Sequence, residues 1–117
     1  MNKKRVQQIS EEVRKSLSDI VQNKVKDPRI PELLSISHVD VTNDLSFAKV
    51  YVSVFGTETQ KEDAIKGLNS AKGFIKKELG RQVKLRAMPE LIFIEDESIE
   101  KGLEMTKLIE EVNNGDK

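Results

Sequence analysis

The side chains best suited to chemistry in this sequence are basic residues gathered in one segment. Residues 72–86 hold six cations against the single acid Glu78, a net charge of +5. These cations are Lys72, Lys76, Lys77, Arg81, Lys84 and Arg86. Two or three of the first members share one helix face at this spacing. The segment therefore predicts phosphate contacts, although a solvated helix face has the same pattern.

A second basic region lies in the first thirty residues, where eight cations face four acids. The candidates for phosphate contact there are Lys3, Lys4, Arg5 and Arg29. The net charge of the 117 residues is zero, but its distribution is uneven. Residues 1–94 carry 17 basic against 12 acidic residues, whereas residues 95–117 carry 3 against 8. A basic body followed by an acidic end is compatible with a nucleic-acid partner.

Catalytic and metal chemistry have little support in the residue types. The chain has no cysteine, and its one histidine, His38, is insufficient for an ordinary zinc site. No glycine-rich loop of the kind that cradles nucleotide phosphates is present. The acids Glu95, Asp96, Glu97 and Glu100 would attract Mg²⁺, but such a run is more often a solvated helix start. We expect no catalytic residue, cofactor or metal.

The composition predicts one domain with an aliphatic core, because hydrophobic residues make up 37% of the chain and aromatic residues only 4%. No apolar run is long enough for a signal peptide or a membrane span. We expect a soluble cytoplasmic monomer without a membrane partner or a small-molecule substrate. The domain is expected to cover residues 1–112, followed by a frayed tail at 113–117.

The hydrophobic periodicity predicts an amphipathic helix over residues 4–26, ended by Pro28. Alternating β-branched residues predict strands at 36–42 and 47–55, joined by a turn at 43–45 into an antiparallel hairpin. Because the alternation leaves one face polar, helices should cover only one side of the sheet.

A second helical pattern begins at Thr59, where Thr59 and Glu62 match a capping box. It bends near Gly73, continues through Phe74, Ile75 and Leu79, and is predicted to end at Gly80. The apolar run 91–94 predicts a third, more buried strand, and residues 98–112 predict a last helix. The order is α-β-β-α-α-β with a C-terminal helix, an α+β fold with helices on one face of a three-stranded sheet.

The ordered set of these segments resembles the ribosome-binding factor A family over nearly the whole chain. The resemblance rests on 5–9, on Asp27-Pro28-Arg29-Ile30, on 39–53, on Gly73-Phe74-Ile75, on Leu85-Arg86 with 88–91, and on Phe93, Asp96 and Ser98. It implies a type II K-homology-like fold. The Gly-x-x-Gly clamp of ordinary K-homology domains is replaced by an interhelical kink, here Ala71-Lys72-Gly73, and the resemblance makes Ala71 and Gly73 candidates for RNA contact beside Lys72.

The resemblance also implies a function. It implies a non-catalytic factor that binds the small ribosomal subunit and its 16S rRNA during late maturation. It further implies support for precursor 5′-end processing and importance for growth in the cold. Two other hypotheses remain open: a protein–protein adaptor acting through the acidic C-terminal helix, and a metal-dependent nuclease using Glu95, Asp96 and Glu97.

Overall fold

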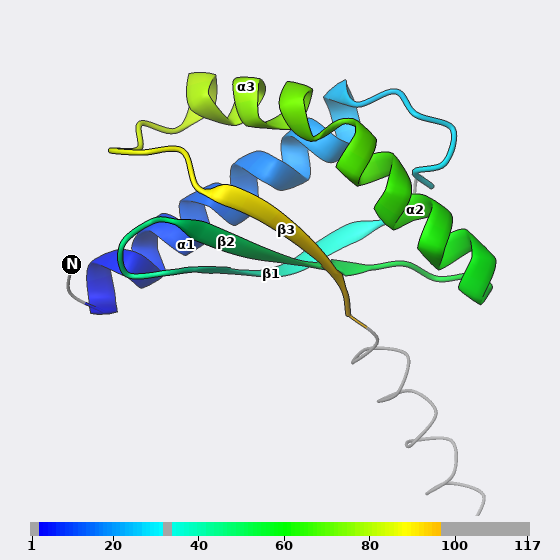
Figure 1. The fold of residues 1–117 in the computed structure, drawn as a ribbon, viewed down its shortest axis with the longest axis horizontal. Coiled ribbons are helices and arrows are strands. Elements are labelled where there is room, and N and C mark those ends of the chain that lie inside the picture. The colour runs from blue at the N-terminus through cyan, green and yellow to red at the C-terminus, as the bar shows by residue number, and fades with distance from the viewer. Residues whose placement is uncertain (1–2, 32–33, 97–117) are drawn as a thin grey trace, which may run out of the picture.

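The computed structural model describes residues 3–31 and 34–96. Three helices lie on one side of a three-stranded sheet, as Figure 1 shows. The elements follow in the order α1 (Lys3–Asp19), η1 (Ile20–Lys24), β1 (Ser35–Val41), β2 (Phe47–Ser53), α2 (Glu58–Ser70), α3 (Lys72–Gln82) and β3 (Glu90–Glu95). The α+β class and the helix-covered sheet face are thereby confirmed. The predicted helix 98–112 and the tail 113–117 lie outside the described residues.

The sheet has the order β1-β2-β3, with β2 in the centre. β1 and β2 pair antiparallel as the short turn predicts, while β3 adds parallel to β2. The turn contains Leu45 at φ 61°, a left-handed backbone conformation that costs about 1 kcal/mol in a residue other than glycine. Leu45 is nevertheless only 4% exposed, so its side chain belongs to the core.

The core forms between the helices and the inner face of the sheet. Ala48, Val50, Val52 and Val54 are all buried, as the alternation in β2 predicts. α1 packs on β1 and α2 packs on β3. On the opposite face of β2, Phe47 stays 46% exposed.

The third strand differs from its prediction. Among the strands of residues 3–31 and 34–96, β3 lies at the edge of the sheet and is not more deeply buried than the others. Leu91 and Phe93 point into the core, whereas Ile92 between them is 37% exposed. A short apolar run cannot by itself distinguish a strand covered on both faces from an edge strand covered on one.

The first helix ends earlier than predicted. A π-helical turn closes it, since the Val25 N–H donates to the Ile20 carbonyl at 3.0 Å and Val25 is already extended. Pro28 lies three residues further on, in a turn in which the Ile30 N–H donates to the Asp27 carbonyl at 3.0 Å. The proline therefore shapes the turn and does not end the helix.

Two boundaries in the second helical region also need correction. The capping box uses Thr57 and Gln60 rather than Thr59 and Glu62, with reciprocal hydrogen bonds of 3.2 and 2.8 Å. Both pairs match the sequence pattern of a capping box, but the structure forms the reciprocal hydrogen bonds only between Thr57 and Gln60. α3 continues past Gly80 to Gln82, because the Val83 N–H donates to the Leu79 carbonyl at 2.9 Å. The bend itself is confirmed at Ala71, between α2 and α3.

Candidate nucleic-acid interface

Two of the predicted cations on α3 are held by an acid from the sheet. Lys72 Nζ lies 3.5 Å and Lys76 Nζ lies 3.0 Å from the carboxylate of Glu90, at the start of β3. The hydrogen bond from Lys76, followed by the charges of both lysines, lowers the pKa of the Glu90 carboxyl. These two cations therefore have part of their charge compensated within the protein.

Two further predicted cations are compensated in the same way. Arg81 Nη1 lies 3.2 Å from the carboxylate of Glu78, which Lys24 Nζ approaches at 3.4 Å. Arg29 is paired with Asp27 at 2.7 Å. The sequence placed Arg29 beside Arg5 in one basic region, but the structure separates them: Arg29 belongs to the turn after η1, and Arg5 to the start of α1.

The Asp27–Arg29 pair gives a pH dependence that can be measured. Hydrogen bonds from the Arg29 side chain, and then from its backbone N–H, lower the pKa of the Asp27 carboxyl from 3.8 to about 2. A depressed carboxyl pKa stabilises the fold above the ordinary value, and this contribution is lost as the pH falls towards the folded-state pKa. Urea unfolding of the wild type should therefore show stability falling more steeply between pH 3.8 and about 2 than in Asp27→Asn. Parallel profiles for the two proteins would show that the pair adds nothing.

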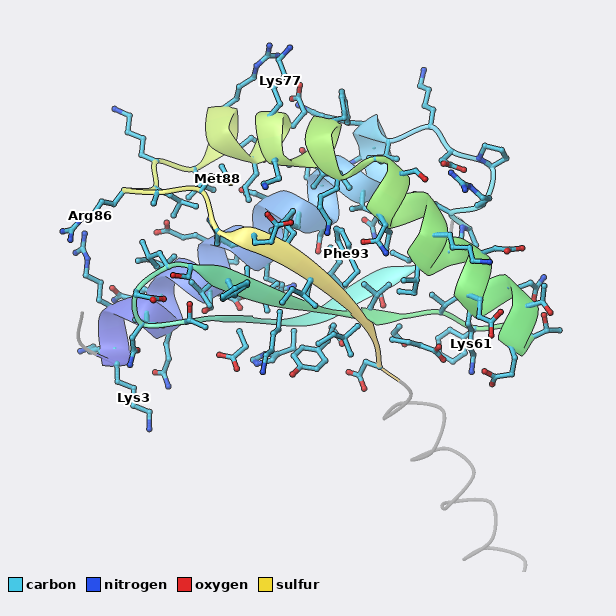
Figure 2. The ribbon with its side chains drawn as sticks, viewed as in Figure 1. Lys3, Lys61, Lys77, Arg86, Met88 and Phe93 are labelled. Carbon is cyan, nitrogen blue, oxygen red and sulfur yellow. The ribbon has the colours of Figure 1, made fainter. Side chains whose placement is uncertain are left out.

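Three other predicted cations have no such compensation within the part of the chain that the structure describes. Lys77, Lys84 and Arg86 are exposed, and none of them makes an ion pair with another described residue. Figure 2 shows Lys77 on the outer side of α3, and Arg86 at the end of the molecule where α1 begins, with Lys3 on the same end. Lys3 and Lys4 are also exposed. Of the predicted cations without an ion pair among the described residues, Lys84 and Arg86 thus lie at the same end of the domain as Lys3, whereas Lys77 lies on α3.

At this end the structure brings together residues that lie far apart in the sequence. A hollow of about 170 Å³ opens between the first turns of α1 and the segment after α3. We call it the basic hollow; its lining residues are Arg5, Gln8, Ile9, Glu12, Leu45, Lys84, Leu85 and Arg86. The sequence analysis identified its three cations as candidates for phosphate contact. It did not predict that they lie in one hollow, and it did not identify Gln8 and Glu12. Gln8 and Glu12 follow Arg5 at helical spacing, which is the one signal that places them on the same face.

A second hollow lies at the bend between α2 and α3. This kink groove has a volume of about 350 Å³ and is lined by Lys24, Val25, Lys26, Asp27, Ser70, Ala71 and Phe74. The sequence predicts Ala71 at this bend. It also predicts Phe74 in the apolar stripe, but Phe74 is 45% exposed. Ile75 and Leu79, one turn apart, form the buried stripe, and Phe74 is rotated away from it.

Gly73 lies next in sequence to residues of this groove, and packing within the protein does not require a glycine at this position. Apart from its two chain neighbours and the nearby backbone of its own helix, no atom of the described residues lies within 4 Å of the position of an added Cβ. Gly67 in α2 is different, because an added Cβ would lie 3.1 Å from Ile30 Cγ1 and 3.3 Å from Arg29 Cβ. Gly67 thus allows the turn at 27–30 to pack closely on α2, whereas Gly73 leaves open space.

The contrast between the two glycines predicts opposite effects of alanine. Gly73→Ala should raise the free energy of unfolding by up to about 1 kcal/mol, since alanine favours a helix over glycine. It should also weaken binding several-fold if a partner's backbone approaches this open surface. Gly67→Ala, the control, should lower stability despite the same gain in helix propensity. Urea unfolding and partner binding of both variants test this prediction. Unchanged binding by Gly73→Ala would show that the bend does not contact the partner.

The acids proposed for a metal-dependent nuclease have other contacts. Glu95 lies 3.7 Å from the buried Lys61, and Asp96 accepts a hydrogen bond of 2.7 Å from Ser37. Glu97 lies outside the described residues. Across residues 3–31 and 34–96, no group of three or more His, Cys, Asp or Glu side chains is placed to hold a metal ion. No helix in that same part is long and apolar enough to cross a membrane.

Comparison with known proteins points to one family. The family model described as ribosome-binding factor A matches residues 5–109. A ribosome-binding factor A of Acetivibrio thermocellus is 53% identical over 109 residues, covering 93% of this chain and 89% of the relative. The crystal structure of ribosome-binding factor A from Thermus thermophilus superposes with a TM-score of 0.68 at 30% identity, covering 75% of this chain and 92% of the other.

A second structural neighbour carries information about a partner. It is a homology model of the Thermus thermophilus factor fitted into an electron cryo-microscopy map of its complex with the 30S subunit. This neighbour has a TM-score of 0.65 at 28% identity, covering 79% of this chain and 96% of the other. These neighbours have a K-homology-like fold, so the type II K-homology-like architecture expected from the resemblance is confirmed.

Proposed function

Because the chain belongs to the ribosome-binding factor A family, we propose that it is a non-catalytic assembly factor for the small ribosomal subunit. It binds the small subunit through 16S rRNA during late maturation and supports processing of the precursor 5′ end. The same proposal includes action as a cytoplasmic monomer and importance for growth in the cold. The 30S complex of the Thermus thermophilus relative supports the choice of partner.

The observation that carries this proposal is that three cations from distant segments of the chain line one hollow. Lys84 and Arg86 have no acidic partner among the described residues, and they line the basic hollow with Arg5. Cations already paired with carboxylates must break those pairs before they contact phosphate, while unpaired cations need not. This end therefore provides the most favourable phosphate contacts, and they need not depend on RNA sequence.

The bend between α2 and α3 provides a second contact. Lys26 and Ala71 line the kink groove, and the exposed Phe74 provides an aromatic face on which a base can stack. Gly73 beside it leaves room for the close approach of a sugar–phosphate backbone. Lys72 and Lys76 can contact phosphate here only if they give up their ion pairs with Glu90.

Co-sedimentation of the purified protein with small and large ribosomal subunits over a salt series tests the function. We expect binding to small subunits alone, weakening steadily as salt rises, because phosphate contacts release counterions. Equal sedimentation with both subunits, or binding that does not respond to salt, would contradict the proposal.

A further inference from the structure

The basic hollow contains an acid that a phosphate site does not need. Glu12 lines the hollow together with Arg5, Lys84 and Arg86. Glu12 makes no ion pair with any described cation, since none lies within 4.0 Å of its carboxylate. A carboxylate at this place repels phosphate and would weaken a site that binds only the RNA backbone. An ionised carboxylate only accepts hydrogen bonds, so a ligand group that contacts Glu12 in this hollow must donate them.

The remaining lining residues provide a surface for a flat group. Ile9 and Leu85 are half-buried, and Leu45 is almost fully buried in its left-handed turn. The Gln8 amide can both donate and accept a hydrogen bond. At about 170 Å³, the hollow is smaller than the roughly 300–1,000 Å³ of pockets that hold whole small-molecule ligands. It suits one inserted base rather than a base pair or a cofactor.

We propose that the basic hollow receives the base of one unpaired guanine nucleotide of RNA. This inference rests on the proposed function and specifies what the RNA-binding end recognises. Lys84 and Arg86 contact the flanking phosphates, the apolar wall covers a face of the base, and the Glu12 carboxylate accepts hydrogen bonds from guanine N1–H and N2–H.

Guanine is the base that fits the carboxylate. Its Watson–Crick edge presents two adjacent donors, which match the two oxygens of a carboxylate. Adenine and cytosine present one amino donor beside a ring nitrogen that accepts, and uracil presents one N–H between two carbonyls. Each of these bases would bring an acceptor against a carboxylate oxygen. Single-stranded RNA is read in this way, through the edges of unstacked bases.

Short oligouridine RNAs with a single central guanosine, inosine or uridine test the inference by fluorescence anisotropy with the full chain. Inosine keeps N1–H but lacks the N2 amino group. The wild type should bind the guanosine RNA about tenfold more tightly than the inosine RNA, the effect of one hydrogen bond to a charged group. Equal affinities for the two RNAs would overturn the inference, and this comparison requires no variant.

Glu12→Gln provides the second measurement, with Glu62→Gln on α2 as the matched control. Glu62 is exposed and lies outside both hollows. Glu12→Gln should reduce the guanosine preference to less than about threefold while oligouridine binding stays equal or rises, because a repelling charge is gone. Glu62→Gln should keep the preference. A uniform rise for every RNA in Glu12→Gln, without loss of preference, would show that Glu12 only repels phosphate and does not read the base, and would overturn the inference.

Failure of this inference can be separated from failure of the proposed function. A protein that sediments with small subunits but does not distinguish guanosine from inosine would overturn the guanine site alone. A protein that fails to sediment with small subunits would overturn the proposed function, whatever its base preference.

Discussion

Replacing Lys84 and Arg86 together by glutamate should lower the affinity for small ribosomal subunits by about a hundredfold at moderate salt. Both side chains line the basic hollow without an acidic partner among the described residues, so each is available for a phosphate. Removing two phosphate contacts should also make the dependence of the logarithm of affinity on the logarithm of salt concentration shallower by one to two units. Co-sedimentation at several salt concentrations measures both quantities.

The matched control reverses Lys49 and Lys66, which changes the net charge of the chain by the same amount. Lys49 lies on the exposed face of β2 and Lys66 on α2, and both are exposed. We expect at most a few-fold loss of affinity from this general change in charge. If both double variants lose affinity equally, the interaction depends on net charge and not on the end of the domain. Lys76 and Arg81 are less informative positions, because their reversal would also set two carboxylates against Glu90 and Glu78.

Replacing Leu91 by alanine should lower the free energy of unfolding by about 2–5 kcal/mol. Leu91 is fully buried on the inner face of β3, where it stands opposite Ala48 of β2. Truncation leaves a cavity between the sheet and the helices that neighbouring residues fill only in part. Ile92→Ala, one residue further along the same strand, should cost about 1 kcal/mol or less, because Ile92 is 37% exposed on the open face.

Urea unfolding of the two variants therefore tests the placement of β3 directly. The comparison keeps the strand, the distance from its ends and the size of the deleted group nearly constant. A strand covered on both faces would give two similar losses. An Ile92→Ala loss as large as that of Leu91→Ala would mean that something covers the open face of the sheet in solution.

Local patterns in the sequence were sufficient for much of the fold. The alternation from 47 to 54 predicts which side of β2 is buried, and the short turn at 43–45 predicts an antiparallel hairpin. The bend near Gly73 is visible because a glycine interrupts a helical pattern. These features depend on neighbours within a few residues, which is the range over which periodicity and turn chemistry act.

The features that the sequence did not reveal depend on contacts between distant segments. Glu90 compensates Lys72 and Lys76 only because β3 returns beside α3, so a count of charges in 72–86 overestimates the free cations. Arg5 meets Arg86 only because the start of α1 and the segment after α3 reach the same end of the domain. The sequence therefore identified individual candidate cations, but neither their division into compensated and uncompensated groups nor the other residues that line the hollows.

The parallel pairing of β2 with β3 also bears on the order in which the chain folds. The β1–β2 hairpin joins residues close in sequence, so it can form while synthesis is still under way. β3 cannot join until the whole crossover through α2 and α3 has emerged. Until then the β2 backbone, central in the finished sheet, is an unpaired edge next to the apolar side chains of Ala48, Val50 and Val52. The last described strand thus completes the three-stranded sheet and also closes an edge at which the nascent chain is open to aggregation.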